Sequence, residues 1–216
     1  MRKTGKEDQS KIMSSRDKIL AAVVANQPKT TPLPDISFLK GNTGNVQETQ
    51  EKFITTLTAI GGKIIEITSL EEVNNHIQAT TTENQRVITT LTGLNKRAEI
   101  INDQSVLPHT FQDVELGILG AHLGVAENGA VWIGGDLINH RVLPFICQHL
   151  AIVVNRQAIV PTMHEAYEKI GTESYGYGTF IAGPSKTADI EQSLVLGAHG
   201  SRTMTVFLMD EGKVNE

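Results

Sequence analysis

From Val46 onward, hydrophobic positions recur with two different periods, and this pattern predicts helices alternating with strands. Apolar residues at helical spacing follow Val46, and Gly61-Gly62 ends that segment. The predicted strands are residues 63–68, 86–90, 114–121, 126–133, 150–154, 178–182 and 203–209, with a turn around Leu123-Gly124. The predicted helices are residues 46–60, 70–79, 161–170 and 187–196. Such alternation is typical of an α/β layer structure with a mostly parallel sheet.

The first 45 residues follow another pattern, rich in polar residues and proline. Ser14 or Ser15 is expected to cap a short helix over residues 16–26. The prolines that follow end this helix, because proline lacks an amide donor and disfavours helix in the residue before it. We therefore divide the chain into three parts: a disordered tail (1–12), a helical arm that packs on the body (13–45) and one domain (46–212).

Composition narrows the class of protein. The chain has 216 residues, enough for one sizeable domain, and its 24 acidic against 19 basic residues argue against non-specific nucleic-acid binding. The single cysteine, Cys147, excludes intrachain disulfides and a cysteine-ligated iron–sulfur cluster, and fits a reducing compartment. No apolar run approaches the ~20 residues that span a bilayer, and the polar start lacks the apolar core of a signal peptide. We therefore expect a cytoplasmic protein without nucleic-acid or membrane partners.

The segment most indicative of chemistry is Gly183-Pro184-Ser185-Lys186, between a predicted strand and a predicted helix. In open α/β sheets, ligands bind at strand carboxyl ends, where a helix N-terminus favours an anion by about 0.3–1 kcal/mol. Lys186 would add a full charge. The neighbouring polar side chains that would support it are Ser185 and Thr187 as hydroxyl donors and Asp189 as an orienting carboxylate. The alternative is an ordinary strand–loop–helix corner with Thr187 as its N-cap. The segment matches neither nucleotide-binding motif of the P-loop or Gly-x-Gly-x-x-Gly type.

A second candidate is Glu127-Asn128-Gly129, within an otherwise apolar strand pair. Asn-Gly between such runs is a strong hairpin signal, so one interpretation is simply a turn. The other is a carboxylate facing a cleft, whose partial desolvation would raise its pKa from about 4.3 and suit a base or nucleophile.

Other candidates are single residues. Arg141 could clamp a carboxylate or phosphate, and His140 could exchange protons, or both could be ordinary loop residues. His199 could lie over the same cleft or cap a helix C-terminus. Cys147 lies in an apolar run and is interpreted as a core residue. The histidine spacing matches no strong metal-binding signature, so we predict no metal site.

Residues 183–191 and the following Leu-Val-Leu-Gly-Ala-His-Gly closely resemble the signature of the LUD domain family, which includes lactate utilization protein C. Residues 126–129 match an Ala-Glu-Thr-Gly-like strand of that family, with Asn128 in place of the commoner Thr. Arg141 and Leu143-Pro144 match an Arg and a Leu-Pro pair that precede a buried strand. The resemblance covers roughly residues 110–209.

The resemblance implies a NagB/RpiA/CoA-transferase-like fold, a Rossmann-like three-layer α/β sandwich with a mostly parallel sheet. It also implies a role in organic-acid utilization, with L-lactate as the expected acid, as an accessory subunit beside iron–sulfur partner proteins. Glu127-Asn128-Gly129 also resembles the Glu-Asn-Gly of class I CoA-transferases. The alternative function is therefore a CoA-transferase or sugar-phosphate isomerase-like enzyme with Glu127 as nucleophile or base. Whether the chain is an enzyme and which cofactor it uses stay open.

The expected ligand is a small anionic metabolite in a cleft at strand carboxyl ends. The expected catalytic residues are Glu127 and Asp189, and the expected ligand-binding residues are Asn128, Gly129, Arg141, Gly183, Pro184, Ser185, Lys186, Thr187 and His199. A homodimer is the default oligomer, because closed homo-oligomers are common.

Overall fold

The computed structural model describes residues 14–32, 34–39, 45–103, 105–171, 176–186, 197 and 199–210. The chain forms two units, residues 1–36 and 37–216, each considered by itself. In the first unit, helix α1 (Ser15–Ala25) begins at Ser14, whose hydroxyl accepts a hydrogen bond from the Asp17 amide while the Asp17 carboxylate accepts one from the Ser14 amide. This reciprocal cap confirms the predicted helix and selects Ser14 over Ser15. Packing of the arm on the body stays a prediction.

The second unit contains a parallel sheet that is six-stranded within the described residues, in the order β1-β10-β7-β4-β2-β3. Its strands are β1 (Lys63–Ile67), β2 (Arg86–Thr89), β3 (Glu99–Ile100), β4 (Val114–Ala121), β7 (His149–Asn155) and β10 (Thr203–Met209). Every neighbouring pair in this order is parallel. The predicted fold class is confirmed: a mixed α/β protein with a mostly parallel central sheet. The strands 114–121 and 203–209 have the bounds that periodicity predicts.

Helices and short turns connect the strands. The helices of the unit are α2 (Val46–Ala59), α3 (Leu70–Thr80), α4 (Leu143–Ile146) and α5 (Met163–Ile170). The 3-10 turns are η1 (Ser37–Leu39), η2 (Thr92–Leu94), η3 (Pro108–Phe111) and η4 (Arg156–Ala158). Helix α5 begins two residues later than predicted, because the Thr162 hydroxyl caps it by accepting from the Glu165 amide. The predicted helix 187–196 lies outside the described residues.

A second, four-stranded sheet corrects the predicted connectivity. It has the order β8-β5-β6-β9, with β5 (Leu123–Val125), β6 (Ala130–Gly134), β8 (Ile159–Val160) and β9 (Gly178–Ile181). The predicted strand 126–133 begins too early, because β6 starts at Ala130, and the predicted turn at Leu123-Gly124 is wrong, because both residues belong to β5. The turn falls at residues 126–129, where Gly129 has a φ of +69° and the Asn128 side-chain oxygen accepts from the Ala130 amide. Strand β9 pairs antiparallel with β6 and therefore does not belong to the parallel sheet.

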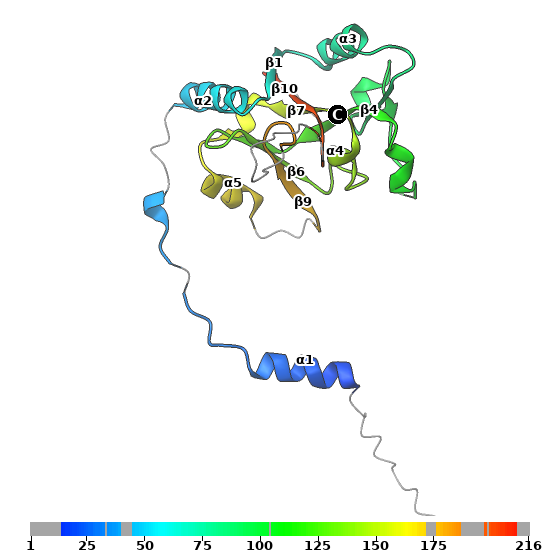
Figure 1. Ribbon diagram of the computed structural model, residues 1–216. Coiled ribbons are helices and arrows are strands. Elements are labelled where there is room, and N and C mark those ends of the chain that lie inside the picture. Colours follow the sequence, from blue (N-terminus) through cyan, green and yellow to red (C-terminus); the bar gives the residue numbers. More distant parts are fainter. Residues whose placement is uncertain are drawn as a thin grey trace, which may run out of the picture. The chain divides into compact units, whose positions relative to one another are not determined.

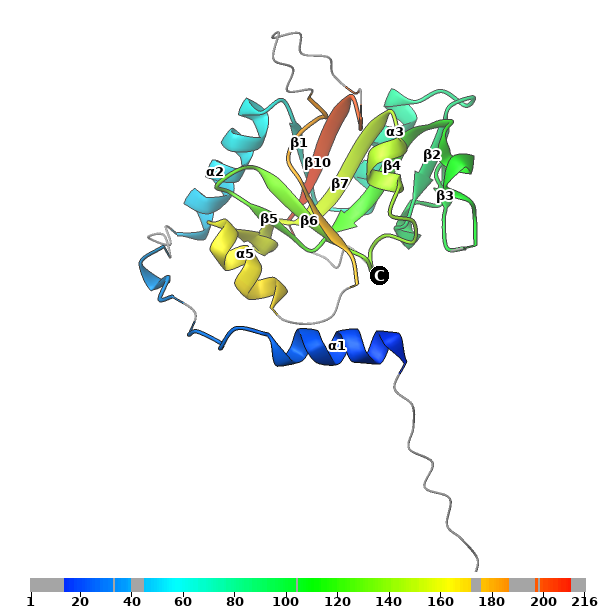
Figure 2. The ribbon, with the colours of Figure 1, turned by 60° about the horizontal axis from the view of Figure 1, so that its bottom comes forward.

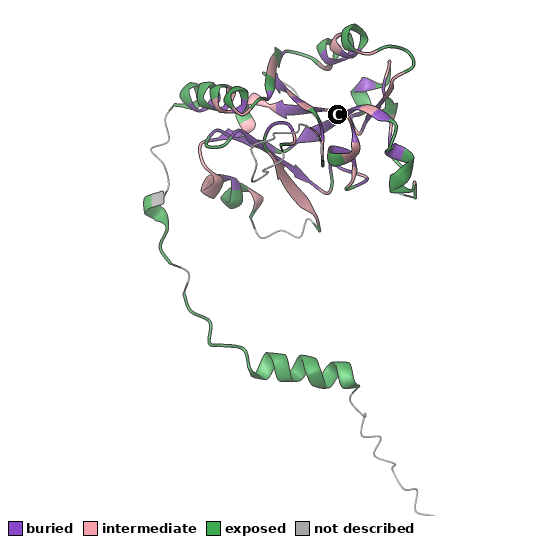
Figure 3. Ribbon diagram, in the orientation of Figure 1, coloured by how far each residue is buried: buried purple, intermediate pink, exposed green. Residues whose placement is uncertain are grey.

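The layers follow from where the apolar side chains point. Val73 and Ile77 of α3 pack with Phe207 on one face of the parallel sheet. On the other face, Phe53 of α2 and Val131 of β6 share a larger core with strands β7 and β10. Figure 1 shows α3 on one side of the sheet and β6, β9 and α5 on the other, and Figure 2 shows β5 and β6 in front of β10 and β7. Burial is concentrated in these strands (Figure 3).

The C-terminal end of α2 and the residues after it (57–61, below called the α2 end) lie against the second sheet. A Cβ at Gly129 would lie 2.9 Å from Leu57 Cα, and one at Gly183, which has a φ of +72°, would lie 3.1 Å from the Ile60 carbonyl oxygen. Only glycine permits both the positive φ and this approach of backbone to backbone. The α2 end therefore fixes both the β5–β6 turn and the loop after β9.

We expect Gly129→Ala to lower the free energy of unfolding by at least ~1 kcal/mol more than Gly176→Ala. Both glycines have a positive φ, 69° and 64°, but a Cβ at Gly176 would meet no atom within 4 Å. The comparison therefore separates the contact with α2 from the cost of the backbone angle. Urea unfolding followed by circular dichroism measures both changes, and equal losses would contradict this account of the α2 contact.

Candidate functional site

A hollow of about 270 Å³, below called the β9–β10 hollow, lies between the loop after β9 and the segments that precede β7 and β10. Its lining residues are Pro144, Phe145, Phe180, Ile181, Ala182, Gly183, Pro184, Ser185, Lys186, His199, Gly200 and Ser201. Five predicted ligand-binding residues, the four at 183–186 and His199, thus line one hollow.

Backbone hydrogen bonds hold the loop in this hollow. The Ser185 amide donates to the Ser201 carbonyl at 2.9 Å, and the Gly197 amide donates to the Ser185 carbonyl at 3.1 Å. A Cβ at Gly200 would lie 3.1 Å from the Ser185 Cβ, so the segment around Gly200 and the loop after β9 are in close contact. Both backbone groups of Ser185, the amide and the carbonyl, are therefore hydrogen-bonded. These bonds also fix the position at which the next residue, Lys186, leaves the loop.

The side chains that line the β9–β10 hollow suit an anion. Lys186 contributes an ammonium and His199 an imidazole, and no acidic residue lines the hollow among the described residues. Ser185 and Ser201 add hydroxyl groups, while Phe145 and Phe180 add apolar surface. An ammonium beside neutral donors attracts a carboxylate or phosphate, and the apolar walls favour a small organic group attached to it.

The hollow lies at the carboxyl end of β9 but at the amino ends of β7 and β10. This differs from the expected position at the carboxyl ends of parallel strands, because β9 belongs to the other sheet. The general rule for open parallel sheets therefore does not place this site.

The second predicted candidate lies apart from the lining of the hollow. Glu127 is exposed, and its Oε2 accepts a hydrogen bond from the Met163 amide at 2.8 Å. This amide is one of the donors at the start of α5 that lack a partner within the helix, so Glu127 supplies a cap for α5. Asn128 and Gly129 form the turn described above and do not line the hollow either. The predicted site residues Thr187 and Asp189 lie outside the described residues.

The structure places Arg141 and His140 in separate contacts. The Arg141 guanidinium lies over the Tyr177 ring, with 5.0 Å from Cζ to the ring centroid, and Arg141 does not line the hollow. His140 is buried against Phe111, and its Nε2 bonds the Asp103 carbonyl at 2.7 Å. These contacts support packing roles for both residues.

Sequence reasoning missed several lining residues, among them Phe145, Gly200 and Ser201. A signal existed for the first of these, because Phe145 directly follows the Leu143-Pro144 pair that carries part of the family resemblance. Gly200 and Ser201 follow His199, but their importance depends on the hydrogen bond to Ser185, which periodicity does not reveal.

A different hollow, of about 340 Å³, lies where β2 ends and is lined by Thr90, Leu91, Thr92, Asn102, Asp136, Leu137 and Asn139. The Thr90 hydroxyl donates to the Leu137 carbonyl at 2.9 Å. Asp136 is acidic and no basic side chain lines this hollow among the described residues. Its charge does not favour an anion, so the β9–β10 hollow remains the better candidate.

The described residues contain no group of three or more histidine, cysteine, aspartate or glutamate side chains that could hold a metal ion. Every helix in this part of the chain is too short or too polar to cross a membrane.

The parallel sheet, with α3 on one face and α2 and the second sheet on the other, defines a Rossmann-like α/β protein. A DUF162 family protein from Deinococcus radiodurans has the same fold, with a TM-score of 0.60, 16% identity, and coverage of 77% of this chain and 99% of that one. The chain belongs to the LUD domain family, whose sequence model matches residues 50–209.

Curated relatives are similar over part of the chain. Lactate utilization protein C from Oceanobacillus iheyensis is 28% identical over 105 residues, which cover 46% of this chain and 45% of that protein. Lactate utilization protein C from Geobacillus thermodenitrificans is 32% identical over 96 residues, covering 41% and 40%. The matched region spans less than half the length of these relatives.

We expect the Cys147 thiol to be unreactive in the folded protein. Burial raises its pKa to about 12, so the thiolate that reacts with alkylating reagents is scarce at pH 8. Alkylation by iodoacetamide, followed by mass spectrometry, should be at least about a hundredfold slower in the native protein than in guanidinium. Equal rates would show that the side chain is accessible.

We expect Glu127→Ala to destabilise the fold by about 0.5–1 kcal/mol, because α5 loses an acceptor and a favourable negative charge at its N-terminus. Glu83→Ala, at an exposed carboxylate in the turn before β2, is the control and should have little effect. Urea unfolding measures both. If Glu127→Ala were as stable as the control but failed to bind a ligand of the native protein, Glu127 would belong to the ligand site instead.

Proposed function

We propose that this LUD-domain chain takes part in L-lactate utilization by binding a small carboxylate in the β9–β10 hollow. One observation carries the proposal: Lys186 and His199 line the same hollow, and none of the described lining residues is acidic. The names of the relatives, lactate utilization protein C, supply the substrate class.

Lactate has three groups that this lining complements. Its carboxylate pairs with the Lys186 ammonium, a charge-assisted contact worth about 1.5–3 kcal/mol. Its hydroxyl bonds the Ser185 hydroxyl or the His199 imidazole, and its methyl group packs against Phe145. A volume of about 270 Å³ suits a small acid and leaves room for water or a further group.

The role we propose is that of an accessory subunit in a cytoplasmic lactate-oxidising system, beside iron–sulfur partner proteins. With one cysteine, this chain cannot supply the thiolates that an iron–sulfur cluster needs, so electron transfer would fall to a partner. Phe145, 41% exposed beside the hollow, offers apolar surface for such a contact.

The contacts of Glu127 favour this binding role over transferase or isomerase chemistry. A nucleophile or base must lie against the substrate, whereas Glu127 Oε2 accepts from the Met163 amide at the start of α5. Glu127 also does not line the β9–β10 hollow, so it is not placed against a ligand bound there.

We expect Lys186→Ala to weaken L-lactate binding by about tenfold or more, because the variant loses the charged partner of the carboxylate. Lys186→Arg should retain most of the affinity, since it keeps the positive charge. Lys52→Ala, at an exposed position of α2, is the charge-matched control and should bind as the native protein does. Isothermal titration calorimetry gives the three dissociation constants. Unchanged lactate affinity in Lys186→Ala would remove Lys186 from the site, and no lactate binding by the native protein would overturn the proposed function.

A further inference from the structure

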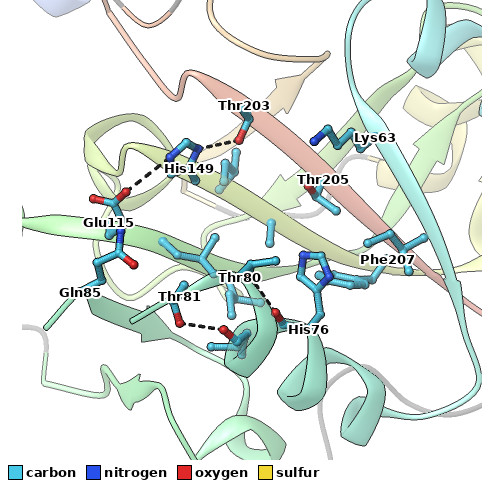
Figure 4. Close-up of a pocket in the computed structure, with 16 residues that line it drawn as sticks. Lys63, His76, Thr80, Thr81, Gln85, Glu115, His149, Thr203, Thr205 and Phe207 are labelled. Carbon is cyan, nitrogen blue, oxygen red and sulfur yellow. Dashed lines mark hydrogen bonds and ion pairs between the residues drawn. The ribbon is translucent and has the colours of Figure 1, made fainter. Parts of the chain in front are cut away.

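A cavity of about 350 Å³ lies on the α3 face of the parallel sheet, near the amino ends of its strands. We call it the amino-edge cavity. Most of the residues that line it come from β1, β10, β7, β4 and α3 (Figure 4). It shares no lining residue with the β9–β10 hollow. Its volume falls at the small end of the range of about 300–1,000 Å³ typical of ligand pockets.

One side of the amino-edge cavity carries a hydroxyl, an imidazole and a carboxylate in a row. His149 Nδ1 shares a hydrogen bond of 2.7 Å with Thr203 Oγ1, and His149 Nε2 lies 3.5 Å from Glu115 Oε1. Strand register brings these three side chains together. Thr203 of β10 is the direct partner of His149 of β7. On the other side of β7, His149 is the partner of Leu116, and Glu115 is the residue before it in β4. The His149 and Glu115 side chains are 39% and 31% exposed, so a ligand can reach them.

The other side carries a positive charge. Lys63 is exposed, and its ammonium has no ion-pair partner among the described residues. His76 lies on the same side, above Phe207, with ring centroids 5.2 Å apart (Figure 4). Burial and, secondly, the charge of Lys63 lower the pKa of His76, so the neutral form of its imidazole predominates at pH 7 and Lys63 supplies the positive charge on this side.

The floor between these two sides is mostly apolar. Ile118, Ala151 and Phe207 contribute apolar side chains to the lining, and Thr205 contributes a hydroxyl. Strand β10 separates β1 from β7, and Lys63 is level with Ala151, two residues along β7 from His149. With ~4.8 Å between neighbouring strands and ~3.3 Å per residue along a strand, the backbones of Lys63 and His149 lie about 12 Å apart. A ligand that spans the cavity therefore needs an apolar body several atoms long.

The geometry points to a second ligand site: the amino-edge cavity binds an organic monocarboxylate with a flat or branched apolar body and a hydroxyl at its far end. The carboxylate pairs with Lys63, the body covers Ala151 and Phe207, and the hydroxyl bonds the Thr203–His149 pair. Glu115 repels a carboxylate at that end and so fixes the direction of the ligand. This site takes larger acids than lactate and does not depend on the function proposed for the β9–β10 hollow.

The test measures the binding of three small molecules of similar shape to the full chain. 4-Hydroxyphenylacetate has the carboxylate, the apolar ring and the hydroxyl; phenylacetate lacks the hydroxyl; and 4-hydroxyphenethyl alcohol lacks the charge. Isothermal titration calorimetry at pH 7 should give a millimolar or tighter dissociation constant for the first. We expect binding about tenfold weaker for the alcohol and severalfold weaker for phenylacetate.

Variants assign the binding to this cavity. Lys63→Gln should weaken 4-hydroxyphenylacetate binding about tenfold, and Thr203→Val, which keeps the side-chain shape, should weaken it severalfold. Lys52→Gln is the control for Lys63→Gln, and Lys186→Ala is the control for the other hollow; both should leave the affinity unchanged. No binding at millimolar concentration would overturn the inference, and so would binding that Lys186→Ala abolishes or that Lys63→Gln leaves intact. Because the Lys186 and Lys63 variants act on separate probes, failure here is distinguishable from failure of lactate binding.

Discussion

The approach of two glycines to the α2 end is the contact on which the rest of this structure depends. Gly129 and Gly183 meet Leu57 and Ile60 so closely that a side chain at either glycine would touch backbone. Through this contact the second sheet is held beside the parallel one, and the loop after β9 enters the β9–β10 hollow at a fixed point. The Ser185 amide then donates to the Ser201 carbonyl, and the Ser185 carbonyl accepts from the Gly197 amide, which fixes the backbone of Ser185.

Both sites lie near the amino ends of parallel strands, and a lysine side chain supplies positive charge at each. Lys186 provides it in the β9–β10 hollow and Lys63 in the amino-edge cavity. In each case the ammonium stands beside an imidazole and hydroxyl groups, on a partly apolar wall. This common pattern suits carboxylates, and the volumes of the two sites are about 270 and 350 Å³.

Periodicity predicted the elements well but not which sheet each strand joins. Strands 114–121 and 203–209 were predictable because mainly apolar runs of this length fit a buried strand and are short for a helix. The sequence of β9 does not differ in pattern from the other predicted strands. Only its antiparallel pairing with β6 shows that it belongs to the second sheet. Sequence spacing grouped the residues at 183–186 with His199, as the structure does. It did not reveal that Glu127 bonds an amide 36 residues away. Nor did it bring Glu115, His149 and Thr203 together, because strand register joins residues that are far apart in sequence.

The most direct test of the central claim is a titration of the isotope-labelled chain with L-lactate, followed by the amide signals in nitrogen–proton NMR spectra. If the loop held by the α2 end forms the carboxylate site, the signals of Ser185, Lys186, Gly200 and Ser201 move together along one binding curve, while those of Thr90 and Asp136 stay in place. Shifts confined to the hollow at the end of β2, or spread evenly over the surface, would contradict it.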